Sequence, residues 1–384
     1  MKLARHRRLG GMLALALALA LCGLVPAPAA GAAERAGTTP PLAPSAGPAS
    51  LKSIARMVFQ SKRDGNWEIY IADGDASGET RLTDNPANDM HPRLNRGSTR
   101  VAFASNRDGN DDIYVMNADG SGLTRLTTNL ANDTDPFWSP DGTRLLFTSD
   151  RDGNNEIYVM NADGTNQTRL TNNPASDVDA AYAPDGATIA FVSDRQAAGG
   201  AGRHVWLMDA SGDNPRQFGA LTGAGNPIFS PDGSKLAFEV NGNSDGYSDI
   251  GWAPLSSGAT TILTYGSPYP WYDQHLGSWS PDGQWLAKST WTYFYCAGLC
   301  LYQNVTYYFG LATPEWAATR LTSSALDTDV DWQTADILPP VSTITAEVTA
   351  LDAASVPVHW SAVDQGPAGV ASYDIQVRRD DATA

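Results

Sequence analysis

The sequence has 384 residues, of which 42% are hydrophobic and 18% are charged, and its formal net charge is −16. This hydrophobic fraction is typical of globular proteins and excludes a chain that is disordered throughout. The acidic balance argues against a nucleic-acid partner, because it repels phosphate backbones. The length favours a repeat architecture that grows by adding units over one ordinary compact domain.

Residues 1–32 have the pattern of a secretory signal peptide. Several basic residues precede an apolar run over 12–25, and Ala30-Gly31-Ala32 is a candidate cleavage site. The run is short for a membrane span. We therefore expect an exported protein that is periplasmic, on the cell surface or extracellular and does not span the membrane. Cys22 leaves a lipid anchor open, although Leu21 is larger than the residue that normally precedes a lipidated cysteine.

A linker rich in Ala, Pro, Gly and Thr occupies residues 33–50, and a repeat of about forty-four residues follows over 51–335. Arg-Leu-Thr or a looser copy of it marks the end of each unit at 81–83, 125–127, 169–171, 220–222, 262–264 and 320–322. Six copies predict six units.

Each unit has the pattern of four short strands. In 136–171, turns at Pro140-Asp141-Gly142, Asp152-Gly153-Asn154 and Asp163-Gly164 separate segments that lack helical periodicity. Asp-Gly favours a tight hairpin, because glycine accepts positive φ and aspartate caps the turn. A lone four-stranded sheet has two faces to bury, so we predict that six such sheets stack around an axis as an all-β, six-bladed β-propeller.

The two ends of the repeat region complement each other. The first unit begins at its second strand, over 56–61, and the last Arg-Leu-Thr is followed by residues 329–333, which match 135–139. We predict that this C-terminal strand completes the first blade and closes the ring. The aromatic residue before each Pro-Asp-Gly turn is interpreted as packing between blades; these residues are Trp138, Tyr182, Phe229 and Trp279.

The recurring motifs carry a family resemblance. Trp-Ser-Pro-Asp-Gly, Ser-Asp-Arg-Asp-Gly-Asn, Ile-Tyr-Val-Met-Asn-Ala-Asp-Gly and Arg-Leu-Thr resemble the WD-related repeat of the TolB propeller family over about 51–333. Blade two departs from the pattern, with Leu94-Asn95-Arg96-Gly97-Ser98 at the first turn. The family's TolB proteins carry an α/β domain before the propeller, whereas only the linker stands there in this sequence.

The composition changes after the propeller. Residues 339–384 are similar to the opening strands of immunoglobulin-like or fibronectin-type modules, and forty-six residues provide about three strands where such a sandwich needs about seven. We expect a partial β-sandwich module there, either truncated or degenerate.

The loops that enter the first strands carry the strongest candidate site. We expect Asp89, His91, Asp135, Asp179 and Asp329 to converge on one mouth of the central channel, where they would hold a cation such as Ca²⁺ or a basic segment of a partner. The alternative is that these residues cap their loops and face solvent. No cofactor is required on either interpretation.

Two other features have competing interpretations. Asp150, Asp152, Asn154 and Glu156 alternate oxygen ligands as calcium loops do, but tight-turn chemistry explains them better. An aromatic insertion around 291–304 contains Cys296 and Cys300, for which we predict a short disulfide in an oxidising compartment. The insertion is equally consistent with a partner contact and with a hairpin that packs on its own blade.

The leading functional hypothesis is an exported, non-catalytic, monomeric scaffold that binds a protein partner. No nucleophile, base and orienting acid can be assembled from a recognised motif, which argues against an enzyme. One alternative is a metal-assisted carbohydrate-active lyase or hydrolase, since some propellers similar to this one act on acidic sugars. The other is a surface adhesin, which the C-terminal module suggests.

Overall fold

The computed structural model describes residues 55–195, 202–220, 222–240, 248–263, 272–296, 299–310, 319–320, 327–334, 341–346 and 358–363. All described residues belong to one unit of the chain, Ala46–Ala384. The predicted signal peptide and linker lie outside the described residues. No helix in the described part of the chain is long and apolar enough to cross a membrane.

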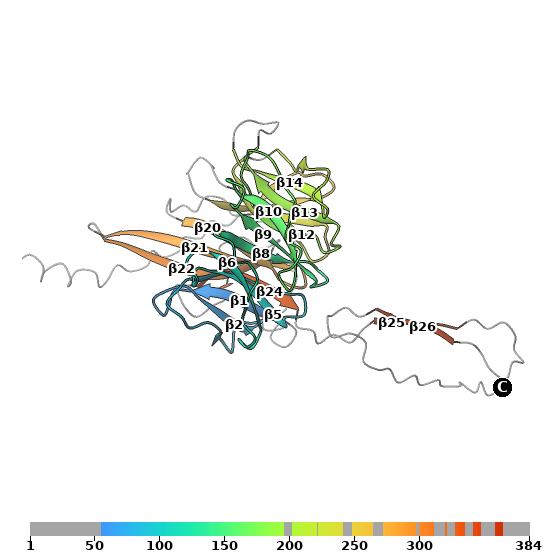
Figure 1. Cartoon of the computed structure of the whole chain (residues 1–384), viewed down its shortest axis with the longest axis horizontal. Coiled ribbons are helices and arrows are strands. Elements are labelled where there is room, and N and C mark those ends of the chain that lie inside the picture. Colours follow the sequence, from blue (N-terminus) through green and yellow to red (C-terminus); the bar gives the residue numbers. More distant parts are fainter. Residues whose placement is uncertain are drawn as a thin grey trace, which may run out of the picture. The chain divides into compact units, whose positions relative to one another are not determined.

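The described residues form six four-stranded antiparallel sheets, and several of their strands are labelled in Figure 1. The first contains β24 (Asp327–Thr334), β1 (Ala55–Ser61), β2 (Glu68–Asp73) and β3 (Thr80–Arg81). The second contains β4 (Asp89–Leu94), β5 (Arg100–Ser105), β6 (Asp112–Asn117) and β7 (Thr124–Arg125). The third contains β8 (Asp133–Trp138), β9 (Arg144–Ser149), β10 (Glu156–Asn161) and β11 (Thr168–Arg169).

The other three sheets follow the same order. The fourth contains β12 (Asp177–Tyr182), β13 (Thr188–Ser193), β14 (His204–Asp209) and β15 (Arg216–Gln217). The fifth contains β16 (Ala224–Phe229), β17 (Lys235–Val240), β18 (Asp249–Pro254) and β19 (Thr261–Ile262). The sixth contains β20 (Tyr272–Trp279), β21 (Trp285–Cys296), β22 (Leu299–Gly310) and β23 (Thr319–Arg320), and is described mainly by its backbone.

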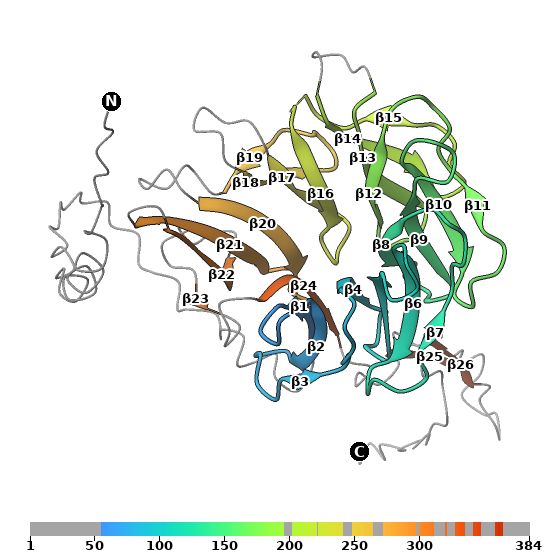
Figure 2. The same ribbon diagram turned by 60° about the vertical axis from the view of Figure 1, so that its left-hand side comes forward.

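The sheets are arranged around a central axis (Figure 2). Their first strands contact one another in the order β24, β4, β8, β12, β16 and β20, and β20 contacts β24. The fold is therefore an all-β β-propeller. As the orphan motif at 329–333 predicts, β24 pairs antiparallel with β1, with Arg56 opposite Gln333 and Met57 opposite Trp332.

An aromatic pair and an arginine stabilise the centre of each of the first three blades. Phe59, Phe103 and Phe147 are fully buried on second strands and lie opposite Tyr70, Tyr114 and Tyr158 on third strands. The ring centroids within these pairs are 5.5–5.8 Å apart. The guanidinium groups of Arg63, Arg107 and Arg151 lie 4.4–4.7 Å from the tyrosine ring centroids. Apolar burial and cation–π contacts thus act together in each hairpin.

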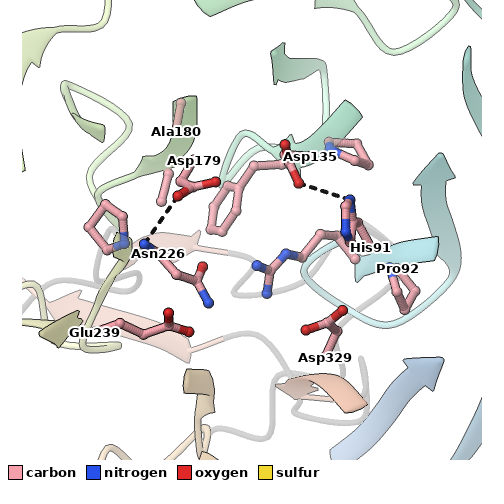
Figure 3. Close-up of a pocket in the computed structure, with 13 residues that line it drawn as sticks. His91, Pro92, Asp135, Asp179, Ala180, Asn226, Glu239 and Asp329 are labelled. Carbon is pink, nitrogen blue, oxygen red and sulfur yellow. Dashed lines mark hydrogen bonds and ion pairs between the residues drawn. The ribbon is translucent and has the colours of Figure 1, made fainter. Parts of the chain in front are cut away.

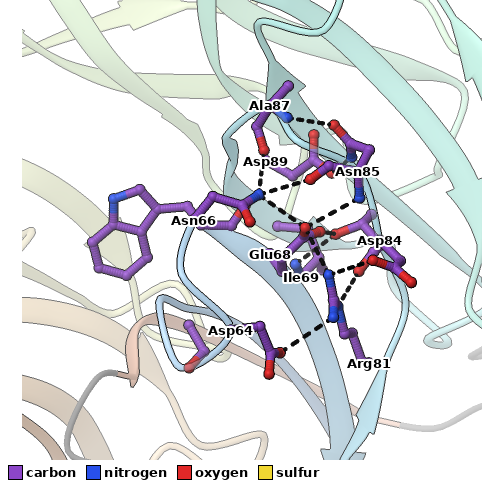
Figure 4. A network of polar contacts seen from close by, with 12 residues as sticks. Asp64, Asn66, Glu68, Ile69, Arg81, Asp84, Asn85, Ala87 and Asp89 are labelled. Atoms are coloured by element: carbon purple, nitrogen blue, oxygen red, sulfur yellow. Dashed lines mark hydrogen bonds and ion pairs between the residues drawn. The ribbon is translucent and has the colours of Figure 1, made fainter.

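In the first three blades an Asp-Gly-Asn turn connects the blade to the loop that leads to the next, and Figure 4 shows this for the first blade. The Asn66 side-chain amide donates hydrogen bonds to the Asn85 carbonyl at 2.9 Å and to the buried Glu68 carboxylate at 2.9 Å. Arg81 donates to the same Glu68 oxygen at 2.8 Å. Asn154 makes the equivalent bonds in the third blade, to Asn173 and Glu156. Asn154 and Glu156 therefore take part in hydrogen bonds that join the turn to the following loop.

The aromatic residues before the Pro-Asp-Gly turns pack between blades, which confirms that interpretation. Trp138 is 4% exposed and its indole donates to the Arg93 carbonyl of the preceding blade at 3.1 Å. Trp279 is 3% exposed and donates to the Ile228 carbonyl at the same distance. Because each bond crosses to the neighbouring blade, these residues fix the spacing between sheets.

Two hairpins differ from the repeat. β21 and β22 pair with each other from Trp285↔Gly310 to Cys296↔Leu299, whereas β20 pairs with β21 only as far as Tyr272↔Thr292. Within the described residues, the end of this hairpin is therefore a two-stranded ribbon. Farther along the chain, β25 (Val341–Ala346) pairs antiparallel with β26 (Val358–Val363). Most of the expected β-sandwich module over 339–384 lies outside the described residues, so its class stays a prediction.

Candidate functional site

The site is built on a β-bulge that recurs in the first strands of the blades. The pairing register shifts at the same position in β24, β4, β8, β12 and β16, and a non-glycine residue with positive φ stands there. These residues are Asp329, His91, Asp135, Asp179 and Asn226, with φ of 52°, 53°, 52°, 55° and 44°. Asp, Asn and His adopt this left-handed conformation more readily than other side chains. The bulge therefore selects short polar residues at equivalent places around the channel.

The bulge side chains converge on one pocket of about 200 Å³ (Figure 3). Four of the five predicted residues line it, namely His91, Asp135, Asp179 and Asp329. Arg93, Asn226 and Glu239 complete its polar lining, and Pro92, Pro136, Phe137, Ala180, Ala181 and Pro227 supply the apolar part. The pocket is thus dominated by carboxylates, with one arginine and one histidine among them.

His91 and Asp135 form a charge pair on neighbouring blades. The Nδ1 atom of His91 lies 2.9 Å from Oδ1 of Asp135. Burial opposes the charged imidazole, but the carboxylates of Asp135 and Asp329 prevail and raise the pKa of His91 to about 9. Burial likewise opposes ionisation of Asp135, but His91 prevails and lowers its pKa to about 2. The pair is therefore an imidazolium–carboxylate pair at neutral pH.

Among the described residues, Asp179 forms no ion pair like that of His91 with Asp135, although Arg203 acts to lower its pKa. Oδ2 of Asp179 accepts a hydrogen bond from the Asn226 backbone N–H at 3.3 Å. Burial, followed by repulsion from Asp135 and Glu239, raises the pKa of Asp179 to about 7. A carboxyl group that is half protonated near neutral pH marks the part of the pocket where a positive charge would be most strongly stabilised.

Three lining residues were not predicted from the sequence. Glu239 reaches the pocket from the second strand β17, and its Oε1 accepts a hydrogen bond from the Leu276 backbone N–H at 2.9 Å. The Asn226 side chain donates to the Leu276 carbonyl at 2.7 Å. The guanidinium of Arg93 lies 5.6 Å from the Phe137 ring centroid. Asn226 could have been predicted from the sequence, because Asn226-Pro227 aligns with His91-Pro92 and Asp135-Pro136 in the repeat.

Asp89 does not join the pocket, contrary to the expected grouping. It is fully buried, and Arg107 donates hydrogen bonds at 2.9 Å to both of its carboxylate oxygens. Asp133 and Asp177 occupy the same position in the next two blades and pair with Arg151 and Arg195. This acidic position lies two residues before the bulge residue in each of these blades, and its ion pair stabilises the hairpin of its own blade. Asp89 and His91 therefore occupy two different positions of the repeat, and only the second faces the pocket.

Two further expectations concern metals and disulfides. Within the described residues, no group of three or more His, Cys, Asp or Glu side chains is placed so that it could hold a metal ion. The backbone register sets Cys296 opposite Leu299 and Cys300 opposite Tyr295. The cysteine side chains lie outside the described part of the structure, so the disulfide stays a prediction.

Comparisons with known proteins agree with this architecture. The family described as the TolB beta propeller domain (PD40) matches residues 92–164 and 150–290. No curated protein matches the sequence.

Solved structures similar to this chain include two TolB proteins. TolB from Acinetobacter baumannii is 21% identical with a TM-score of 0.59, and the match covers 72% of this chain and 66% of that structure. A putative TolB from Agrobacterium tumefaciens is 14% identical with a TM-score of 0.53, covering 73% and 98%. A chain of a nidogen/laminin complex is 10% identical with a TM-score of 0.54, covering 73% and 99%. At these identities the likeness shows the fold alone.

Proposed function

The chain belongs to the TolB beta propeller domain family, and from this premise we propose that it is an exported, non-catalytic scaffold that binds a basic segment of a protein partner at the carboxylate mouth of its channel. The observation that carries the proposal is the raised pKa of the Asp179 carboxyl among other carboxylates of the pocket. This pKa of about 7 reflects burial first and then the nearby Asp135 and Glu239. A lysine or arginine side chain entering the pocket would relieve this repulsion.

The charge of the pocket supports a cationic ligand. Asp135, Asp179, Glu239 and Asp329 line it, and His91 already neutralises Asp135. Arg93 supplies the other positive charge of the lining. The whole chain carries a net charge of −16, so its field also attracts a basic partner from a distance. Both effects favour a basic segment over an acidic or a neutral one.

The lining of the pocket supports binding without turnover. His91 and Asp135 resemble the base and orienting acid of a nucleophilic site, but the described lining contains no Ser, Thr, Cys or Lys side chain for them to activate. The main residues of the pocket are also held by the backbone, because Glu239 and Asp179 accept hydrogen bonds from Leu276 and Asn226 backbone N–H groups. A fixed set of charges suits recognition of a partner.

The proposal includes three features of the whole chain. We take the six sheets as the six blades of one ring, closed by β24. Residues 1–32 serve as the export signal. The segment over 339–384, which follows the propeller in the sequence, is a partial immunoglobulin-like or fibronectin-type module. Each follows from the sequence patterns described above.

A capture experiment with charge-neutral variants tests the proposal. The purified propeller, the double variant D179N/D329N and the control D84N are used as bait in envelope extract. Asparagine is the proper replacement, because Asn226 adopts the same left-handed conformation at the equivalent position. Asp84 is a suitable control, because its side chain is 88% exposed outside the pocket.

We expect a protein that the native chain and D84N retain at low salt and that D179N/D329N loses. Equal capture by all three baits would contradict the channel-mouth site. Steady turnover of a polyuronate, peptide or ester substrate that is abolished by H91Q would favour the enzyme alternative instead.

A further inference from the structure

A second cavity of about 390 Å³ occupies the opposite end of the first strands. Along each strand the bulge residue comes first and the Pro-Asp-Gly turn comes last, so the carboxylates and the turns lie at different ends of the channel. Arg93 and Phe137 line both cavities and stand between them. We call this second cavity the turn chamber.

The wall of the turn chamber is mainly apolar and repeats from blade to blade. Trp138, Tyr182, Phe229 and Trp279 line it, each followed two residues later by a proline that also lines it. These prolines are Pro140, Pro184, Pro231 and Pro281. The four aromatic side chains are largely buried between blades and present only part of their surface to the chamber. Its size and composition are those of a small-molecule site.

The rim of the chamber is preformed. A Cβ placed on Gly186 would lie 3.8 Å from Cδ of Pro140, and one on Gly233 would lie 3.7 Å from Cδ of Pro184. Each turn therefore stacks against the turn of the blade before it. Asp141 fixes its own turn by accepting hydrogen bonds from Ser139 and Thr143. A ligand would find this wall in place, without an ordering cost.

Arg96 interrupts the apolar rim. In blade two, Leu94-Asn95-Arg96-Gly97-Ser98 replaces the usual turn, and Arg96 occupies the position of the proline. Its side chain is exposed, lines the chamber and has no ion pair among the described residues. Asp331, the acid in the lining, is 1% exposed and accepts a hydrogen bond from the Leu94 backbone N–H at 2.7 Å. Arg93, the other arginine of the lining, lies 3.9 Å from Asp331. The chamber thus combines an apolar wall with the exposed guanidinium of Arg96 at its edge.

We propose that the turn chamber binds a small amphipathic carboxylate, with the apolar body against the aromatic and proline wall and the carboxylate on Arg96. Arginine pairs with a carboxylate through two parallel hydrogen bonds. A single negative charge fits better than a phosphate or a polyanion, because the chain itself is strongly acidic. The same chemistry is found in a free acid and in the C-terminus of a peptide with an apolar last residue.

Calorimetric titration with 4-phenylbutyrate tests this proposal. We expect one site per chain with a Kd of about 0.1–1 mM, and at least fivefold weaker binding of 4-phenylbutanol, which lacks the charge. R96Q should reduce the affinity for 4-phenylbutyrate to that for the alcohol. R216Q is the matched control, because Arg216 is equally exposed on the outer strand β15 and should leave binding unchanged.

The outcomes separate the proposal from its alternatives. Acetyl-Gly-Gly-Phe with a free carboxylate is titrated beside its C-terminal amide. Tighter binding of this peptide than of 4-phenylbutyrate identifies a peptide C-terminus as the source, and the reverse order identifies a free acid. Equal binding of acid and alcohol, an unchanged affinity in R96Q, or no heat at 10 mM 4-phenylbutyrate would overturn the proposal. Thermal melts of R96Q and R216Q verify that both variants are folded.

Discussion

Asp179 and Asn226 occupy equivalent bulge positions on neighbouring blades, and the Asp179 carboxylate accepts a hydrogen bond from the Asn226 backbone N–H at 3.3 Å. One blade thus has an ionisable carboxyl where the next has its neutral isostere. Both residues tolerate the positive φ that the bulge requires. Exchanging Asp for Asn at position 179 therefore changes the charge of the pocket with little change to its backbone.

The first prediction concerns the pH dependence of stability in D179N. The folded-state pKa of Asp179 is raised to about 7 from an ordinary value of 3.8, so the folded state binds the proton more tightly than the unfolded state. Ionisation then costs stability as the pH rises from about 4 through 7. We expect D179N to be more stable than the native chain above pH 7, by on the order of 1 kcal/mol after screening at this partly exposed group. The gain should vanish toward pH 4.

Thermal melts between pH 4 and 8 measure this difference, with D84N as the control. A D179N variant that is less stable than the native chain at pH 8 would contradict the electrostatic account of the pocket.

The second prediction concerns the protonation of His91. Asp135 and Asp329 raise its pKa to about 9 against the effect of burial. Because the folded-state pKa is raised, the stability contributed by His91 is fully present below about pH 6.5 and is lost as the pH rises through 9. NMR titration of the imidazole should give a midpoint near 9 in the native chain and a much lower one in D135N. An unchanged midpoint in D135N would show that Asp135 does not raise the pKa of His91.

The fold was largely predictable because its signals are local and repeated. Asp-Gly turns define hairpins without reference to the rest of the chain, and residues 329–333 carry the same motif as 135–139. Residues 329–333 lie in β24, which pairs with β1 because the first blade has no other strand on the inner side of β1.

The site was only partly predictable, because the repeat has two polar positions that lie two residues apart and have different roles. Asp89 and His91 stand in one loop, yet Asp89 pairs with Arg107 and His91 faces the channel. The bulge that turns the second position toward the channel depends on the register between strands and not on residue type. Glu239 joins the pocket from a second strand, and the position of that strand relative to the channel is set by tertiary packing.

The third prediction tests the connection between blades. The Asn154 side-chain amide donates to the Ala175 and Asn173 carbonyls at 2.7 and 3.0 Å and to Glu156 at 2.8 Å. N154A would remove all three hydrogen bonds and leave the two carbonyls without the Asn154 donor, at a cost of about 1–3 kcal/mol. Urea denaturation measures the loss. N172A, at an exposed position with no such role, should leave the midpoint unchanged, and an equal loss in both variants would refute the assignment.

The fourth prediction compares two glycines with similar backbone conformations. Gly164 has φ of +85°, and a Cβ there would lie 2.8 Å from the Leu126 carbonyl oxygen of the preceding blade. Gly153 has φ of +98° and open space around it. Both alanine variants suffer the strain of positive φ, but G164A must also displace the neighbouring blade. We expect G164A to be the less stable by at least about 1 kcal/mol in urea denaturation. Equal stability of the two would show that the blades do not meet at this turn.

A calorimetric titration of the propeller with a capped tetralysine peptide at pH 8 tests whether the carboxylate mouth binds a basic segment. We expect one binding site per chain, with an affinity at least tenfold lower in D179N/D329N and unchanged in D84N. A tetraglutamine peptide should not bind. We also expect weaker binding of tetralysine at pH 6, where Asp179 is largely protonated. Equal affinity of the native chain and D179N/D329N for tetralysine would show that the carboxylate mouth is not the site that binds a basic partner.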